Sequence, residues 1–210
     1  FTQNGYYFNF PHNGLGTLMK LLENKVFIDI GANVGVFSLI ASQIFNDVYS
    51  FEPMKENYEL LENNLKLNKI SNVHTYNYAI GENEGHVELI INPLNNGGTS
   101  VKLLNKKEKH SIKIVNLDKL NFKRVDLIKI DVEGSELEVL KGLKKTKDNC
   151  NPTFFIEISS SIQNVKEILA TLGKDYYAYY PSNNKFTGND MIFVHKKNID
   201  LVSKLKRLDL

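Results

Sequence analysis

VFIDIGANVG, residues 26–35, is the stretch that decides the fold. Val26–Ile30 is a short apolar run that stops abruptly at Gly31, which is typical of a strand buried in a parallel sheet. Apolar residues at helical spacing follow over 36–44. A strand that turns at glycines directly into a helix begins an alternating strand–helix pattern, so this stretch predicts an α/β fold.

The same alternation extends through the rest of the chain. Further strands are predicted at 48–51, 73–80, 125–130 and 153–158, and further helices at 55–69, 135–143 and 162–172. Short strands are predicted at 86–91, 99–103 and 111–115, with an Asn/Gly turn at 95–98, and a final hairpin at 176–180 and 191–195 around 181–189. A Lys-rich helix is expected from about residue 198. The pattern indicates a mostly parallel sheet with helices on both faces.

The 210 residues suit one domain with a sizeable core. Residues 1–24 form an irregular, aromatic and Asn/Gly-rich lead that ends in a short apolar helix near 15–23. We expect this lead to be a substrate lid, or a linker from a longer protein, since the chain begins with Phe1 rather than Met. Residues 25–210 are expected to form the catalytic domain.

Composition excludes several classes of partner. The net charge of +2 is too weak to predict nucleic-acid binding, and no apolar run approaches the ~18 residues that a bilayer-spanning helix needs. No signal peptide opens the chain. The single cysteine, Cys150, lies in a predicted loop and cannot form an intrachain disulfide, which fits a reducing, cytoplasmic compartment.

The ends of the first two predicted strands carry the chemistry of a cofactor site, because ligands of parallel sheets bind at those ends. Gly31 and Gly35 allow a sharp turn and the close approach of a ligand, and the start of the helix offers N–H groups that suit a carboxylate. Asp29 could hold an ammonium group, so the loop is typical of a site for a zwitterion, such as the methionine end of S-adenosylmethionine. Glu52, at the end of the second strand, can accept both hydroxyls of a ribose.

A nicotinamide dinucleotide is the competing cofactor. Its fingerprint is G-x-G-x-x-G, which binds a pyrophosphate, whereas the glycines here follow a G-x-x-x-G spacing. Asp29 immediately before the turn would repel a pyrophosphate. The spacing and the charge therefore favour the methyl donor.

The fourth strand carries an unusual charged segment, DLIKIDVEG, at 126–134. Lys129 and Asp131 share one face of the strand, and a lysine in an apolar strand is costly unless it is paired, with Asp131 or Glu133 as its partner. A buried pair that merely sets geometry is the structural alternative. Because buried ion pairs contribute little to stability, a functional role is the stronger interpretation.

Several segments together resemble the FkbM family of S-adenosylmethionine-dependent O-methyltransferases. They are VFIDIGANVG at 26–35, FEP at 51–53, NYAIGENEG at 77–85, NLDKL at 116–120 and DLIKIDVEGSELEVL at 126–140, with weaker matches in FFIE at 154–157 and NDMIF at 189–193. The resemblance covers about 25–195 and leaves residues 1–24 without a family pattern. The K-x-D-x-E-G segment is more specific than the glycine loop.

The resemblance implies a Rossmann-like class I methyltransferase fold with a seven-stranded sheet and an antiparallel final strand. It implies that Asp29 and the loop contact the methionine end of the cofactor, that Glu52 contacts the ribose, and that the segment 77–79 lies against the adenine. The cofactor-binding residues expected on this basis are Asp29, Gly31, Ala32, Asn33, Gly35, Glu52, Pro53, Asn77, Ala79 and Asp131. The family's acceptors are typically hydroxyl groups of sugars or small metabolites.

Methyl transfer from a sulfonium is an in-line displacement, so the enzyme must align the acceptor oxygen, exclude water and take a proton. The candidate catalytic residues are Asp131, Lys129, Glu133 and Glu157. Asp131 and Glu157 end neighbouring strands, so the two carboxylates could also hold a divalent metal ion.

Three other functions stay open at this point. They are methylation of RNA or protein, an NAD-dependent oxidoreductase, and a non-catalytic cofactor-binding module. The weak net charge and the lack of an N-P-P-Y-like segment after the fourth strand count against methylation of nucleic-acid bases. The sequence identifies neither the acceptor nor the oligomeric state.

Overall fold

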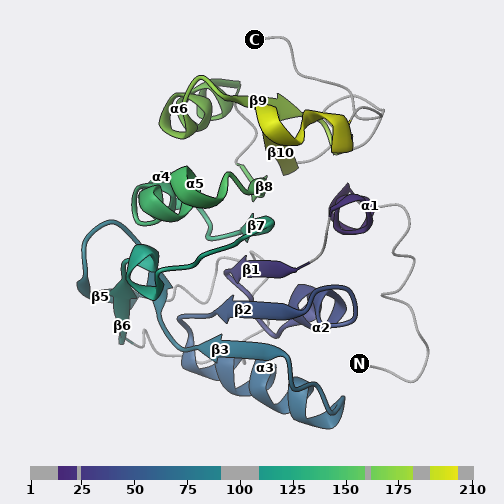
Figure 1. Cartoon of the computed structure of the whole chain (residues 1–210). Coiled ribbons are helices and arrows are strands. Elements are labelled where there is room, and N and C mark those ends of the chain that lie inside the picture. Colours follow the sequence, from purple (N-terminus) through teal and green to yellow (C-terminus); the bar gives the residue numbers. More distant parts are fainter. Residues whose placement is uncertain (1–13, 23–24, 91–108, 159–161, 182–189, 203–210) are drawn as a thin grey trace.

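The computed structural model describes residues 14–22, 25–90, 109–158, 162–181 and 190–202. A seven-stranded sheet with the strand order β3-β2-β1-β7-β8-β10-β9 forms its centre (Figure 1). The strands are β1 (Val26–Ile30), β2 (Asp47–Phe51), β3 (Val73–Tyr76), β7 (Leu127–Ile130), β8 (Thr153–Glu157), β9 (Tyr176–Tyr179) and β10 (Asp190–His195). The first five in the order run parallel, and β10 is antiparallel to both β8 and β9. The predicted sheet, with its antiparallel final strand, is confirmed.

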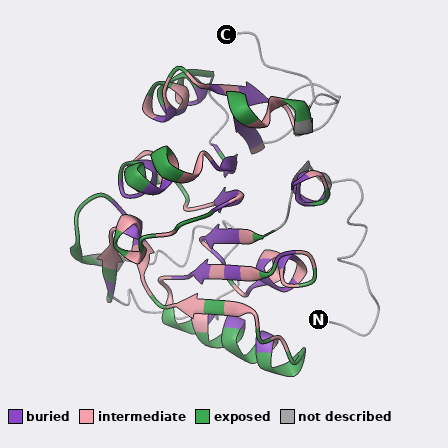
Figure 2. Ribbon diagram, viewed as in Figure 1, coloured by how far each residue is buried: buried purple, intermediate pink, exposed green. Residues whose placement is uncertain are grey.

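Helices cover both faces of the sheet (Figure 1). One face carries α1 (Gly14–Leu21), α2 (Val36–Ala41) and α3 (Lys55–Leu67), and the other carries α4 (Glu136–Lys141), α5 (Lys144–Cys150) and α6 (Ile162–Leu172). Successive residues of β1 therefore enter different cores: Phe27 packs with α1 and α2, and Ile28 packs with α4 and α6. Figure 2 shows that the central strands are largely buried, and burial on both faces explains why most of their residues are apolar.

Helix α1 packs into the same core as the sheet. Leu15, Leu18 and Met19 are fully buried there, together with Phe27 of β1 and Ile192 of β10. The described part of the predicted lead thus contributes to the main hydrophobic core.

Residues 73–80 were predicted as one strand but form two. β3 ends at Tyr76, and β4 (Ala79–Ile80) joins β6 (Lys109–Val115) and β5 (Gly85–Ile90) in a separate three-stranded sheet. Tyr76 stacks on the ring of Phe51, and Tyr78 packs against the same ring, with centroids 4.9 and 5.7 Å away. These contacts hold the chain against the end of β2 at the point where it leaves the main sheet.

The segment after α4 also differs from the prediction. Cys150 ends helix α5 instead of lying in a loop. Asp118, in the 3-10 helix η1 (Leu117–Leu120), accepts hydrogen bonds from the backbone N–H groups of Lys145 and Thr146 at 2.8 and 2.7 Å. This distant cap supports a helix whose sequence has a weak apolar pattern.

The last described residues form the 3-10 helix η2 (Lys196–Val202), where the prediction placed a helix from about 198. The predicted strand at 99–103 and turn at 95–98 lie outside the described residues, as does most of the hairpin loop at 181–189. Among the described residues, every helix falls short of the length and apolarity needed to cross a bilayer.

Candidate active site

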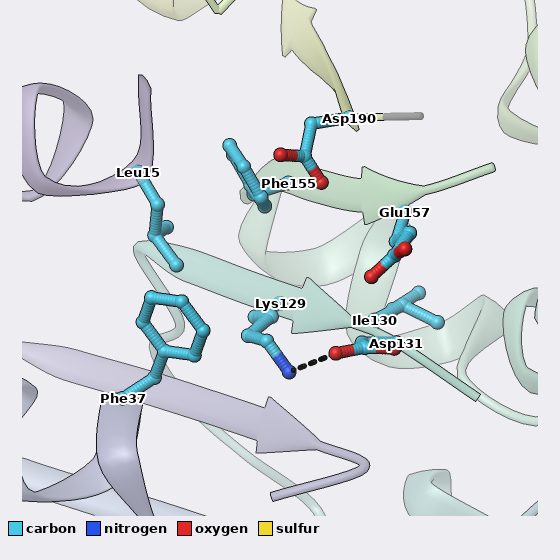
Figure 3. A pocket seen from close by; sticks show the side chains of 8 residues that line it. All are labelled: Leu15, Phe37, Lys129, Ile130, Asp131, Phe155, Glu157 and Asp190. Atoms are coloured by element: carbon cyan, nitrogen blue, oxygen red, sulfur yellow. Dashed lines mark ion pairs between the residues drawn. The ribbon is translucent and has the colours of Figure 1, made fainter. Parts of the chain in front are cut away.

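A cavity of about 120 Å³ lies at the carboxyl ends of β7 and β8, beside the start of β10 (Figure 3). Its lining residues are Leu15, Phe37, Lys129, Ile130, Asp131, Phe155, Glu157 and Asp190. Leu15 and Phe37 lie on one side of the Lys129 side chain, and the carboxylates lie on the other (Figure 3). The cavity therefore has an apolar wall from α1 and α2 and an acidic wall from the sheet.

Lys129 is the buried cation of this cavity, with 3% of its surface exposed. Its Nζ lies 3.2 Å from Oδ2 of Asp131 and 3.4 Å from Oδ1 of Asp29, and it donates to the carbonyl of Gly31 at 3.2 Å. Burial by itself lowers the pKa of Lys129, but the two carboxylates outweigh it and leave this pKa raised. Lys129 therefore stays charged. The predicted pairing with Asp131 is confirmed, and Asp29 is a second partner that the sequence did not reveal.

Asp29 is fully buried and faces the interior of the protein. Its Oδ2 accepts a hydrogen bond of 2.6 Å from the hydroxyl of Ser38, and its Oδ1 faces Lys129. The register of β1 and β7 places Asp29 directly beside Lys129. The contact of Asp29 with the cofactor stays a prediction, and its partners within the protein are Ser38 and Lys129.

The glycine loop closes onto the protein's own backbone. The N–H groups of Gly31 and Ala32 both donate to the carbonyl of Phe51 at 3.0 Å. Gly31 has a φ of +77°, and a Cβ added there would lie 1.8 Å from the carbonyl oxygen of Asp131. This glycine is therefore required for close packing of β1 against β7, and the loop has fewer free N–H groups than expected.

Glu52 lies at the end of β2 with 4% of its surface exposed. Its Oε2 accepts from the backbone N–H of Asn33 at 2.8 Å, and its Oε1 accepts from that of Met54 at 2.9 Å. Burial raises the pKa of Glu52, and these two hydrogen bonds partly offset the effect. The side chain of Asn57 also donates to this carboxylate, which keeps part of its acceptor capacity for a hydroxyl.

Of the other predicted cofactor-binding residues, Asn77 lies beside Glu52, whereas Ala79 belongs to the small sheet. Asn77 donates from its side-chain amide to the carbonyls of Glu52 and Pro53, at 2.9 and 3.1 Å, and so lies beside them. Gly35 begins α2 with a φ of +88°. Ala79 belongs to β4 of the small sheet, where it pairs with Ile114.

Glu157 and Asp190 occupy opposing positions on β8 and β10 and both line the cavity. Partial burial, Asp131 and Asp190 together raise the pKa of Glu157 to about 7. Burial and the charge of Asp131 also raise the pKa of Asp190. Asp190 was missed from the sequence, where it stands immediately before the final strand. That strand runs antiparallel, so its first residue meets the carboxyl ends of the parallel strands.

Glu133, a predicted catalytic residue, is close enough for its charge to contribute to the raised pKa of Glu157. It is exposed, has a φ of +53°, and does not line the cavity. Asp131 and Glu157 are brought together as predicted. Within the described ranges, no group of three or more His, Cys, Asp or Glu residues is placed to hold a metal ion.

The seven-stranded sheet and the charged cavity at its ligand-binding edge define the class of Rossmann-like methyltransferases. A family model described as Methyltransferase FkbM domain matches residues 29–181, well over half of the chain. The chain therefore belongs to the FkbM family of methyltransferase domains.

Two curated relatives and one solved structure illustrate this similarity. Methyltransferase 1 of Beauveria bassiana (strain ARSEF 2860) is 24% identical over 147 residues, which cover 58% of this chain and 59% of that protein. Hexuronic acid methyltransferase AglP of Haloferax volcanii is 29% identical over 133 residues, covering 61% and 54%. The crystal structure of methyltransferase FkbM from Methylobacillus flagellatus KT has a TM-score of 0.58 and 21% identity, covering 82% and 44%. The chain thus spans less than two thirds of each of these proteins.

Proposed function

We propose that the protein transfers a methyl group from S-adenosylmethionine to a hydroxyl group of a sugar, a glycan or a small metabolite. The observation that carries this proposal is the cavity at the carboxyl ends of β7 and β8, where Lys129, Asp131 and Glu157 converge next to the glycine loop. Membership of a methyltransferase family supports the class of reaction.

The residues around β1 and β2 fit the proposed cofactor. Glu52 is held by two backbone N–H groups and the side chain of Asn57 and retains acceptor capacity, which suits the hydroxyls of a ribose. Gly31, Ala32, Asn33 and Gly35 form the adjacent turn, Pro53 follows Glu52 directly, and Asn77 donates to the carbonyls of Glu52 and Pro53. A contact of Ala79 with the adenine is part of the same proposal. When bound, the cofactor supplies a methyl group that is already activated by a positively charged sulfur.

Asp29 has an indirect role in this proposal. Its carboxylate binds Ser38 and Lys129, so it contributes charge balance inside the sheet rather than a contact with the cofactor. Asp131, one residue beyond the end of β7 and 32% exposed at its side chain, is the carboxylate that can face both cofactor and acceptor.

Asp131 and Glu157 are the candidates to take the proton of the acceptor hydroxyl. A base is most effective when its pKa lies near the working pH, and Glu157, with a pKa of about 7, meets that condition. Lys129 keeps Asp131 in place from behind. Phe37, Phe155 and Leu15 supply apolar surface that excludes water and suits the apolar face of a sugar ring.

A sugar acceptor is supported by the relative named hexuronic acid methyltransferase AglP. Leu15 lies within residues 1–24 and lines the cavity, which supports a role of this segment in covering the acceptor. Asp131 and Glu157 would be the ligands if a divalent ion takes part, and activity after exhaustive chelation tests that option.

The decisive experiment has two stages. Calorimetry should show binding of S-adenosylhomocysteine and none of NAD, because Glu52 and the glycine loop suit a nucleoside with a zwitterionic tail. A panel of glycosides and small alcohols should then reveal methyl transfer to oxygen by mass spectrometry. Binding of NAD alone, or transfer to a nitrogen or carbon atom, would overturn the proposal.

A further inference from the structure

We propose that Ser38 and Ser50 are positioning residues that act through Asp29 and Lys129 to hold the carboxylate of Asp131 in the active site. Neither serine was predicted as a functional residue, and neither lines the cavity. The proposal rests on the proposed role of Asp131 in taking a proton.

The four side chains behind Asp131 form one buried polar chain. Ser50, Ser38 and Asp29 are fully buried, and Lys129 is 3% exposed. The hydroxyl oxygens of Ser50 and Ser38 lie 2.8 Å apart, and Ser38 lies 2.6 Å from Oδ2 of Asp29. Lys129 then bridges from Asp29 to Asp131, at 3.4 and 3.2 Å. The chain thus runs from β2, through α2 and β1, to the end of β7.

The direction of the hydrogen bonds in this chain follows from counting protons. A hydroxyl has one proton, and an ionised carboxylate only accepts. Ser38 therefore donates to Asp29, which means that Ser50 must donate to Ser38. The serines thereby stabilise the charged form of Asp29, which a buried carboxylate requires.

Asp29 needs the hydrogen bond from Ser38 because its other carboxylate oxygen, Oδ1, has few stabilising contacts. Oδ1 accepts no hydrogen bond from the described residues, so the charge of Lys129 at 3.4 Å compensates it. Lys129 carries three N–H groups, and its neighbours offer three acceptors: Asp29, Asp131 and the carbonyl of Gly31. The ammonium lies within 3.4 Å of all three, so they restrict its position and that of the Asp131 carboxylate that it holds.

The cofactor loop touches this chain where Lys129 donates to the carbonyl of Gly31, but it also has anchors of its own. Gly31 and Ala32 are bound to the carbonyl of Phe51, and Asn33 is bound to Glu52. Loss of Ser38 should therefore displace Asp131 without loosening the loop. This separation distinguishes a positioning role from a general contribution to folding.

The first test is Ser38→Ala, which removes one buried hydrogen bond to a charged group. We expect kcat to fall about tenfold, with the Kd of S-adenosylhomocysteine changed less than about twofold. Ser50→Ala, one step further from Asp29, should lower kcat by about threefold. Ser42→Ala is the matched control, because Ser42 follows the same helix and donates to the carbonyl of Leu39, away from the chain. A weaker Kd with unchanged kcat would overturn the proposal.

The second test needs no acceptor. Ser38 is joined to Asp131 through two intervening side chains, so the effects of Ser38→Ala and Asp131→Asn on the free energy of unfolding should be non-additive in the double variant. Additive effects would show that the chain does not connect them and would overturn the proposal. If every acceptor fails but the coupling is found, the proposed function is wrong and the positioning chain stands.

Discussion

The carboxyl edge of the sheet has two halves that are built from different groups. At β1 and β2, the contacts are made mainly by backbone: Gly31 and Ala32 bind a carbonyl, and Glu52 is fixed by two N–H groups. At β7, β8 and β10, ionisable side chains converge on a cavity, and burial and mutual charge raise the pKa values of Glu157 and Asp190.

The difference fits the two tasks of the proposed reaction. The cofactor is the same in every reaction cycle. A rigid set of backbone contacts suits such a ligand, because its shape does not depend on which side chains are present. Proton transfer needs groups whose pKa values are shifted toward neutrality, which requires burial and nearby charges. Mutations at the ends of β1 and β2 should therefore weaken cofactor binding, whereas mutations at β7, β8 and β10 should lower kcat.

Asp131→Asn should give the largest effect. It removes a carboxylate proposed to take the proton and leaves Lys129 with one fewer charged partner. We expect kcat to fall by roughly 10²–10⁴-fold, while the Kd of S-adenosylhomocysteine stays within about threefold. Steady-state kinetics and calorimetry measure the two values. Asp148→Asn, on the exposed side of α5, is the control. Loss of cofactor binding with unchanged kcat would show that Asp131 serves cofactor binding, like the β1 and β2 half of the edge, and not proton transfer.

Glu52→Gln should give the reverse pattern. The amide group of glutamine would direct N–H toward the backbone N–H of Asn33 or Met54, so one hydrogen bond is lost and an acceptor for the ribose is removed. We expect the Kd of S-adenosylhomocysteine to rise by about 10- to 100-fold, with kcat at saturating cofactor nearly unchanged. Glu138→Gln, a surface residue of α4 paired with Lys141, should change neither value. A normal Kd in Glu52→Gln would contradict the ribose contact.

The pH dependence should isolate Glu157. A base must be ionised to accept a proton, so kcat/KM should rise with pH through about 7, and Glu157→Gln should remove that rise. The transition belongs to the coupled carboxyl groups of the cavity rather than to one residue alone. A pH profile identical in wild type and Glu157→Gln would exclude Glu157 as the proton acceptor.

The free energy of unfolding should also depend on the protonation of Glu157, and the raised pKa fixes the direction of this pH dependence. The folded protein keeps Glu157 protonated above its ordinary pKa of 4.5, so it binds more protons than the unfolded chain between that value and about 7. The free energy of unfolding therefore falls as pH rises through this window. Glu157→Gln should reduce that fall in urea unfolding measured at several pH values.

The sequence predicted features that depend on local pattern. The bounds of β1 and of α6 agree with the residues expected, because an apolar run ended by glycine and a clear helical periodicity are both local signals. The division of 73–80 into β3 and β4 was missed, since it depends on contacts of Tyr76 and Tyr78 with Phe51. Helix α5 was missed because its cap, Asp118, lies far away in the sequence.

In the candidate site, too, the features that were predicted depend on local sequence pattern, and those that were missed depend on tertiary contacts. Lys129 and Asp131 could be paired from strand alternation alone, and Glu157 from its place at the end of a strand. The contact of Asp29 with Lys129 was missed, because the register between β1 and β7 is a tertiary property that no single segment encodes. Asp190 was missed because its position depends on the register of β10 against β8, which pairs it with Glu157.

The smallest expected effect concerns the charge of the acceptor. The cavity holds the carboxylates of Asp131, Glu157 and Asp190, whereas the charge of Lys129 is shared with Asp29. At pH 8 this excess of negative charge should repel an anionic sugar, so a neutral hexoside should be methylated faster than the matched hexuronoside. Asp190→Asn should reduce that preference by about threefold in the ratio of kcat/KM values, as measured by competition.

Asp175→Asn is the control for this change, since Asp175 pairs with Lys196 at the surface and does not line the cavity. A wild-type preference for the hexuronoside would mean that the acidic half of the edge faces a group other than the acceptor. Replacement of a single carboxylate opposite Glu157 should move this chain toward the anionic acceptor.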